Sequence, residues 1–178
     1  PDTIKTIKDF AFYSTALTSI FIPDSVTSIG ESIFEECTNL TSVTLSKNLT
    51  TIPPLVFYDC TSLTSINIPD SVTEIGDGAF ALCALTSINI PNGVTIISSE
   101  AFFFCASLTS INIPDSVKTI GSDAFRGCVA LTSVNIPNGV LNIGPSAFSL
   151  CTNLTVSRPA ARTEWSAGWL GCKDVTTY

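Results

Sequence analysis

The sequence predicts a solenoid of about seven stacked repeats, with a parallel β-sheet on one face and short strands and 3₁₀ or helical turns on the other. Two observations carry this prediction: a unit of 22 or 23 residues recurs along the chain, and its apolar positions recur in step. The units start at Pro1, Pro23, Ser46, Pro69, Pro91, Pro114 and Pro137. A unit this short cannot bury its own apolar side, so each must stack on its neighbours.

The first element of the unit is a strand, which is clearest at residues 63–68. Apolar residues alternate there with Ser65 and Asn67, the pattern of a short strand whose polar side chains face outward. Pro69 and the two residues after it have turn chemistry and end the strand. Stacked copies of this strand predict a parallel sheet with about 4.8 Å between neighbouring strands.

Two further elements complete the unit. Residues 72–76 predict a second short extended segment, which a glycine closes. Residues 78–83 predict one helical or 3₁₀ turn that places Phe80 and Cys83 on the inner side.

Three columns of repeated residues are predicted to form the core. They are Phe12, Phe34, Phe57, Phe80, Phe102, Phe125 and Phe148; Cys37, Cys60, Cys83, Cys105, Cys128 and Cys151; and Leu17, Leu40, Leu63, Leu85, Leu108, Leu131 and Leu154. Equivalent cysteines in stacked repeats have parallel side chains, which suits disulfide bonds badly, so we expect a reduced and buried ladder. Cys172 lies outside this register, and a bridge from it to Cys151 stays open.

The repeated motifs resemble a known family. Leu-x-x-Ile-x-Ile matches the core of leucine-rich repeats, and Ile-Pro-x-Ser-Val-x-x-Ile-Gly-x-x-Ala-Phe-x-x-Cys-x-x-Leu is similar to the BspA-like subclass. The chain departs from this pattern where Ser46 replaces the proline, where Pro53-Pro54-Leu55 replaces Gly-x-x, and where Ile33 and Val56 replace the small residue before Phe. The resemblance implies a right-handed leucine-rich-repeat solenoid. Because similar proteins are mostly bacterial and protist surface proteins that bind host or partner macromolecules, it also implies an extracellular or cell-surface binding role.

The two ends of the chain differ from its middle. The repeat pattern stops after Val156, so we predict a solenoid over residues 1–156 and a capping segment over residues 157–178. Trp165 and Trp169 lie in that segment, and two large side chains suit the task of covering the end of a solenoid core. The first unit begins without a cap-like segment, so either further repeats or a domain precede Pro1, or this unit is an imperfect lid.

The composition excludes several classes of function. The chain has 15 acidic residues and 8 scattered basic ones, for a net charge of −7, which disfavours nucleic acid as a partner. It contains no histidine and no Cys-x-x-Cys motif, so we expect no metal site and no cofactor. A nucleophile needs a base beside it, and none is evident, so we expect no enzyme. No apolar run is long enough to span a membrane.

Two surfaces are candidates for contact with a partner. The first is the outward face of the predicted sheet, where Ser and Asn form uncharged hydrogen-bonding columns at Ser65, Asn67, Ser87, Asn89, Ser110, Asn112, Ser133 and Asn135. Such a face suits a protein backbone, a glycan or solvent. The second is an apolar patch at the variable positions after the repeated Phe, formed by Tyr58, Leu82, Phe103 and Phe104.

These surfaces support two functional hypotheses. The preferred one is a non-enzymatic protein-binding or adhesion module of a surface or secreted protein, with a protein or glycan partner. The alternative is a structural or accessory subunit docked permanently in a larger assembly, in a lumenal or membrane-associated compartment. The isolated chain is expected to be monomeric unless the second hypothesis holds.

Overall fold

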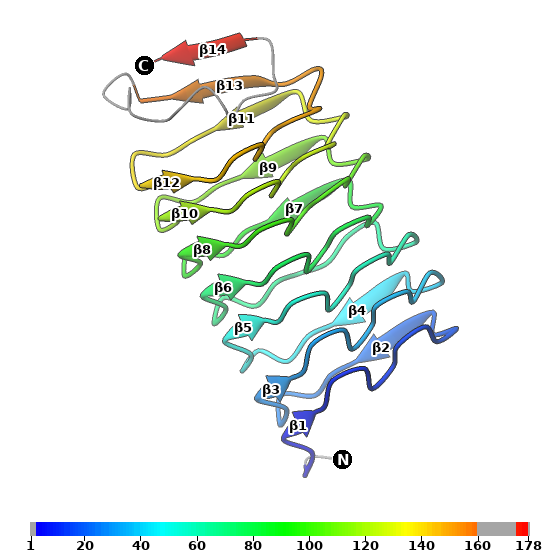
Figure 1. Ribbon diagram of the computed structural model, residues 1–178. Coiled ribbons are helices and arrows are strands. Elements are labelled where there is room, and N and C mark those ends of the chain that lie inside the picture. The colour runs from blue at the N-terminus through cyan, green and yellow to red at the C-terminus, as the bar shows by residue number, and fades with distance from the viewer. Residues whose placement is uncertain (1–2, 160–173, 178) are drawn as a thin grey trace.

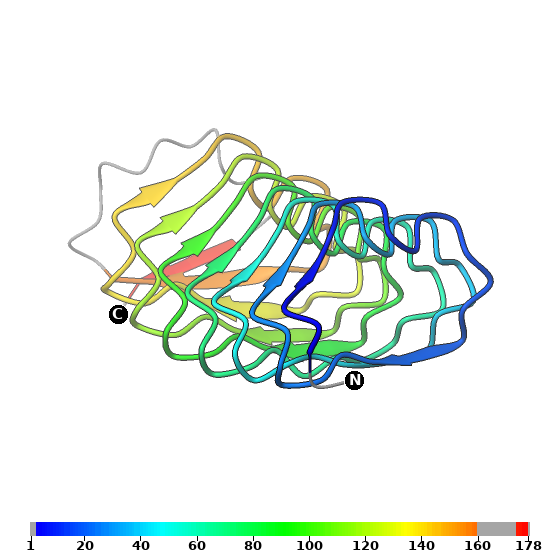
Figure 2. The same ribbon diagram turned by 90° about the horizontal axis from the view of Figure 1, so that it is seen from below.

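The computed structural model, which describes residues 3–159 and 174–177, is a β-solenoid of about seven turns with parallel strands (Figure 1). The predicted fold class is therefore confirmed. Viewed from below, the coils have a common shape and are offset from one another, with the strands on two of their sides (Figure 2). We name each coil by its repeated phenylalanine, from the Phe12 coil to the Phe148 coil.

One side of the solenoid carries strands, most of which the Leu-x-x-Ile-x-Ile motif predicts. They are β2 (Ser19–Phe21), β4 (Ser42–Thr44), β7 (Ser87–Asn89), β9 (Ser110–Asn112), β11 (Ser133–Asn135), β13 (Thr155–Arg158) and β14 (Asp174–Thr177). The motif does not predict β14, and residues 63–68, for which the pattern predicts such a strand, form none. Their ladders are parallel and join β2 to β4, β7 to β9, and β11 to β13 and β14. We call the outward side of these strands the Ser/Asn face.

A second side carries shorter strands, which form the second sheet. They are β1 (Thr6–Ile7), β3 (Ser28–Ile29), β5 (Thr51–Ile52), β6 (Glu74–Ile75), β8 (Ile96–Ile97), β10 (Thr119–Ile120) and β12 (Asn142–Ile143). The strands β5, β6, β8, β10 and β12 form one continuous parallel sheet, while β1 pairs with β3 alone. The isoleucine of each strand points inward, so its polar or exposed neighbour lies on the surface.

The third side, which we call the turn ridge, carries the expected turns. In residues 78–83 the Ala81 amide donates to the Gly78 carbonyl at 3.1 Å and the Cys83 amide to the Phe80 carbonyl at 3.3 Å, the i to i+3 spacing of a 3₁₀ turn, and Phe80 and Cys83 are buried. Gly78 and Leu82 have left-handed backbones, with φ of 59° and 61°, so the turn does not continue as a helix. Left-handed residues recur two positions before and two positions after the phenylalanine in every coil, and most of them are not glycine.

The left-handed residues aim backbone amides at the next coil. In the Phe80 coil, the amides of Gly78, Phe80 and Leu82 donate to the carbonyls of Ser99, Ala101 and Phe103 at 2.8 to 2.9 Å. The same three bonds leave the Phe34 coil, at Ser32, Phe34 and Glu36. The ridge therefore holds neighbouring coils together by backbone hydrogen bonds that all run in one direction.

The core consists of the predicted columns. The seven phenylalanine rings form a stack, with centroids of neighbouring rings 5.2 to 5.5 Å apart and ring planes within 14° of parallel. Six of them are fully buried, and Phe12 at the first coil is half-buried. Because each interior ring contacts a ring on both sides, the stack also fixes the height of every coil.

The C-terminal region extends the sheet beyond residue 156. Strand β14 pairs in parallel with β13, with Val175 opposite Val156. Trp165, Trp169 and Cys172 lie outside the described residues, so the cap over residues 157–178 stays a prediction. Within residues 3–159 and 174–177, no helix is long and apolar enough to cross a membrane.

We expect Phe80→Ala to lower the free energy of unfolding by about 3 to 5 kcal/mol, because it removes a fully buried ring and leaves a cavity in the stack. The measurement is urea unfolding followed by circular dichroism. Phe21→Ala is the control, since the Phe21 side chain is exposed. A loss for Phe80→Ala no larger than that for the control would contradict a structural role of the stack.

Candidate functional site

The Ser/Asn face has the geometry that the sequence predicts. Ser65, Asn67, Ser87, Asn89, Ser110, Asn112, Ser133 and Asn135 are all exposed. The isoleucine or valine between each Ser and Asn points into the core, and Ile88, Ile111 and Val134 are buried. Where the strands pair, like residues are directly opposite, with Ser87 facing Ser110 and Asn89 facing Asn112. The face is therefore a set of regular columns of hydroxyl and amide groups.

The threonine column beside this face has a structural role. The Thr41 hydroxyl donates to the Thr18 carbonyl at 3.0 Å, and the Thr109 hydroxyl donates to the Thr86 carbonyl at 3.0 Å. These bonds satisfy backbone groups between coils, as hydroxyl side chains commonly do. The hydroxyls of Thr41, Thr86 and Thr109 therefore help to hold neighbouring coils together.

The side chains of the Ser and Asn columns make few hydrogen bonds between coils. The Ser157 hydroxyl donates to the Asn135 side-chain oxygen at 2.9 Å. Within the described residues, no other side-chain hydrogen bond involves a Ser or Asn of the eight positions. The outward side chains of β2, β4, β7, β9 and β11 include no ionisable group. The face can therefore offer both donors and acceptors to a partner without a charge of either sign.

The structure brings the apolar patch together but exposes little of it. Tyr58, Leu82 and Phe103 lie in consecutive coils along the turn ridge, and the Leu82 amide donates to the Phe103 carbonyl at 2.8 Å. The Phe103 and Phe104 rings meet edge to face, with centroids 4.6 Å apart. Tyr58, Leu82 and Phe103 are half-buried, and Phe104 is 39% exposed.

The Phe104 ring is held by the next coil. A Cβ placed on Gly127 would lie 2.8 Å from this ring, so the aromatic side chain covers the glycine. Part of the Phe104 side chain is therefore buried against the next coil, and the exposed apolar patch is smaller than the sequence predicts.

The first coil exposes apolar residues that the sequence prediction did not single out. Ile4, Phe10, Tyr13 and Phe21 are 41% to 69% exposed, and a hollow of about 450 Å³ opens beside Phe12 and Ile20. The Tyr13 hydroxyl bonds to Glu36, and this contact raises the pKa of Tyr13. At the Ile4 position the later coils hold buried residues such as Val26 and Val72, whereas the Phe21 position stays exposed along the face from β2 to β11.

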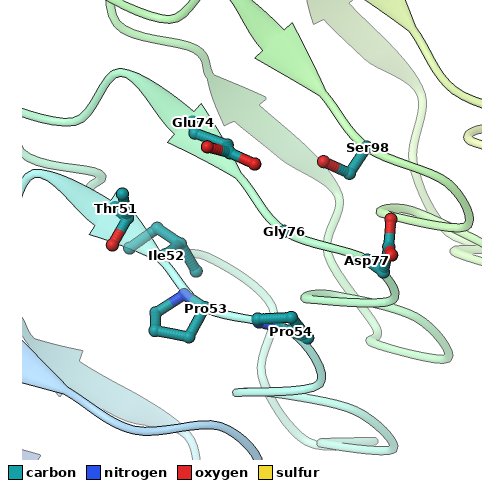
Figure 3. A pocket seen from close by; sticks show the side chains of 8 residues that line it. All are labelled: Thr51, Ile52, Pro53, Pro54, Glu74, Gly76, Asp77 and Ser98. Atoms are coloured by element: carbon teal, nitrogen blue, oxygen red, sulfur yellow. The ribbon is translucent and has the colours of Figure 1, made fainter.

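The second sheet has a smaller hollow of about 250 Å³ beside Pro53 and Pro54 (Figure 3). Glu74 and Asp77 lie at its edge, but their carboxylates do not converge (Figure 3). The Asp77 carboxylate instead accepts the Ser99 amide at 2.9 Å. In the part of the chain that the structure describes, no three Cys, Asp or Glu side chains are placed to hold a metal ion.

The repeat cysteines are free, buried and hydrogen-bonded. Each thiol donates to the phenylalanine carbonyl of the preceding coil, and for Cys105 the acceptor is Phe80 at 3.0 Å. Burial raises the pKa of Cys60 and Cys105 to about 12 and also raises the pKa of Cys83 and Cys128. Because only the thiolate is nucleophilic, these four thiols are poor candidates for catalysis.

The chain matches a family model described as "BspA type Leucine rich repeat region" over residues 1–84 and 73–160. No curated protein matches it.

Three solved structures are similar to the chain. A leucine-rich-repeat protein of T. pallidum is 33% identical, with a TM-score of 0.81 over 85% of this chain and 72% of that one. A leucine-rich cell-surface protein of Faecalibacterium prausnitzii is 42% identical, with a TM-score of 0.79 over 87% of this chain and 43% of that one. A leucine-rich-repeat protein of Bacteroides ovatus is 27% identical, with a TM-score of 0.75 over 97% of this chain and 58% of that one. The chain thus spans about half the length of the latter two.

The raised cysteine pKa values predict a loss of stability in alkali. A thiol whose pKa is higher in the folded state than in the unfolded state stabilises the fold fully below the unfolded value, near pH 8.5, and this stability falls as pH rises toward about 12. In that pH range each such thiol lowers the free energy of unfolding by up to about 1.4 kcal/mol per pH unit. Urea unfolding between pH 7 and pH 10.5 measures the slope.

Cys105→Ala in a Cys172→Ser background is the matched variant for this prediction. It removes one of the buried thiols, so the fall in unfolding free energy above pH 9 should become shallower, whatever the variant's stability at pH 7. An unchanged slope would contradict the assignment of the alkaline loss to the thiol ladder.

Proposed function

Because the chain belongs to the BspA-type leucine-rich-repeat family, we propose that it is a non-enzymatic binding module that contacts a macromolecular partner through the Ser/Asn face. The module comprises the solenoid of residues 1–156, closed by residues 157–178 as a cap. The pairing of β14 with β13 supports this division, since it covers the last predicted repeat strand with a further strand.

The observation that carries the proposal is the contrast between two neighbouring columns. The Thr41 and Thr109 hydroxyls donate to backbone carbonyls of the preceding coil. The exposed Ser and Asn side chains face solvent and make almost no hydrogen bonds within the described part of the protein. Both columns lie on a rigid parallel sheet, so a bound partner would meet preorganised groups. Preorganisation lowers the entropic cost of binding.

We place the protein outside the cell or on its surface. The support is its 42% identity to the F. prausnitzii protein, which is described as a cell-surface protein. A lumenal or membrane-associated place in a larger complex is the alternative. A non-enzymatic role accords with the family, whose members are typically scaffolds, and with the absence of histidine from the sequence.

One observation favours a second candidate, the permanently docked structural subunit. Phe103 and Phe104 leave an aromatic pair partly exposed on the turn ridge, and aromatic side chains are common at the centre of interfaces. The patch is small, because Tyr58, Leu82 and Phe103 are half-buried, so it supports this candidate less well than the Ser/Asn face supports the first.

We expect beads coated with the chain to adhere to surfaces of mucin or purified extracellular-matrix proteins, and Asn89→Lys/Asn112→Lys to reduce adhesion at least about tenfold. The two lysines place charge and bulk in the centre of the Ser/Asn face. The control is Thr51→Lys/Asn142→Lys, which adds the same charge to exposed positions of the second sheet. Equal losses in both variants, or adhesion to none of the surfaces, would count against the proposal.

Size-exclusion chromatography with light scattering separates the two candidates. The binding-module proposal predicts that the native chain and Phe103→Ser/Phe104→Ser are both monomers of equal size, because the ridge patch is not an obligate interface. Self-association of the native chain that disappears in the variant would instead support the docked subunit.

A further inference from the structure

The Ser/Asn face has no strand ladder between the Phe34 and Phe57 coils. A threonine amide ties several other pairs of coils: Thr41 donates to the Thr18 carbonyl at 2.9 Å, and Thr109 donates to that of Thr86 at 3.0 Å. The junctions from residues 65–67 to β7 and from β9 to β11 also lack a ladder, but only at the Phe34–Phe57 junction is the second sheet interrupted as well in the described residues. Within the described residues, no ladder joins β4 to residues 65–67, which form no strand. Two neighbouring segments of the face thus leave backbone groups unpaired.

The second sheet is interrupted at the same junction, and the sequence explains why. The residue after each strand isoleucine normally donates to the preceding coil, as Gly30 does to Ile7 and Gly76 does to Ile52, both at 2.8 Å. Pro53 holds this position in the Phe57 coil, and proline has no amide hydrogen to donate. Accordingly β3 and β5 do not pair, although they are neighbours in the stack (Figure 1).

The junction stays closed along the turn ridge. The Phe34 amide donates to the Val56 carbonyl at 3.0 Å, the Cys60 thiol donates to the Phe34 carbonyl at 3.2 Å, and the Phe34 and Phe57 rings stack at 5.5 Å. These contacts match those of intact junctions. The interruption is therefore a shallow groove across the face, without room for an inserted peptide strand between the coils.

The groove consists of two hollows of about 330 and 350 Å³, which share Asn67. Their lining is Thr41, Ser42, Val43, Thr44, Leu45, Lys47, Ser65, Ile66, Asn67, Ile68, Pro69, Asp70 and Ser71. Six of these residues carry a hydroxyl or amide side chain, five are apolar, and the charges of Lys47 and Asp70 cancel. Ile66 is half-buried, whereas Ile88 and Ile111 at the same position of other coils are buried, so the floor of the groove is partly apolar.

An exposed aromatic ring lies beside the groove. Phe21 is directly opposite Thr44 in the β2–β4 ladder, and its side chain is 69% exposed. It occupies the outward column that holds Asn67 in the Phe57 coil and asparagine in later coils. A flat ring thus adjoins a set of neutral donors and acceptors.

We propose that this groove binds a neutral oligosaccharide. A sugar ring carries hydroxyl donors and acceptors around its edge and apolar C–H groups on its faces, which match the Ser, Thr and Asn lining, the unpaired backbone groups, and the Phe21 and Ile66 surfaces. The lining holds one cation, Lys47, beside one anion, Asp70, so an acidic glycan finds no cationic cluster to pair with. The closed turn ridge disfavours an extended peptide, which would need a free strand edge.

This inference rests on the proposed function, since it assigns a ligand class to a part of the Ser/Asn face. The two proposals can nevertheless be tested separately, because the adhesion test uses Asn89 and Asn112, which lie outside the groove. Adhesion that Asn89→Lys/Asn112→Lys abolishes, without any oligosaccharide binding, would retain the binding module and overturn the glycan site alone.

The test begins with the whole chain on an array of neutral oligosaccharides, with sialylated and sulfated forms of the same cores and a panel of extended peptides for comparison. The neutral oligosaccharide that binds best is then titrated calorimetrically into the native chain and its variants. We expect Asn67→Ala and Phe21→Ala each to weaken its binding about tenfold, and the control Asn112→Ala, in the same column but away from the groove, to change it less than about twofold.

Nuclear magnetic resonance provides a readout that does not depend on variants. We expect the backbone amides of residues 65–67 and the side-chain amide of Asn67 to shift when that oligosaccharide is added, and those of Asn112 to stay in place. The proposal is overturned if no neutral oligosaccharide binds, if only peptides or charged glycans bind, or if Asn112→Ala weakens binding as much as Asn67→Ala.

Discussion

The structure depends on the backbone hydrogen bonds of the turn ridge. Three amides per coil donate to the next coil, and they can do so only because the residues two positions before and after each phenylalanine adopt a left-handed backbone. Such a backbone is costly for residues such as Leu55 and Asp59. The recurring bonds offset this cost and keep the coils at one spacing, which in turn allows the phenylalanine rings to stack and each thiol to reach a carbonyl of the coil before it.

The period of the sequence was sufficient to predict the fold and the core. A repeat of 22 or 23 residues with phenylalanine, cysteine and leucine in step can bury these side chains by stacking on its neighbours. The left-handed positions of the turn were beyond prediction, since such positions are usually marked by glycine and here only Gly78 and Gly127 mark them. The exposure of the Ser and Asn columns followed directly from strand alternation.

The candidate surfaces show where sequence reasoning stops. Phe104 is exposed less than expected because it covers Gly127 of the next coil, a contact across 23 residues that no local pattern contains. The break between β3 and β5 had a visible signal, the replacement of glycine by Pro53, but its meaning requires knowing that this amide normally ties two coils. The groove beside Asn67, on the opposite sheet, had no such signal, because its strand pattern matches that of the paired coils.

The ridge hydrogen bonds all run in one direction along the solenoid, so their dipoles are aligned. At the first coil the carbonyls of Asp9, Ala11 and Tyr13 occupy the positions that accept hydrogen bonds in every later coil. A further coil could continue this ladder only in the same orientation, with its amides meeting these carbonyls, so the ridge admits stacking in one direction only.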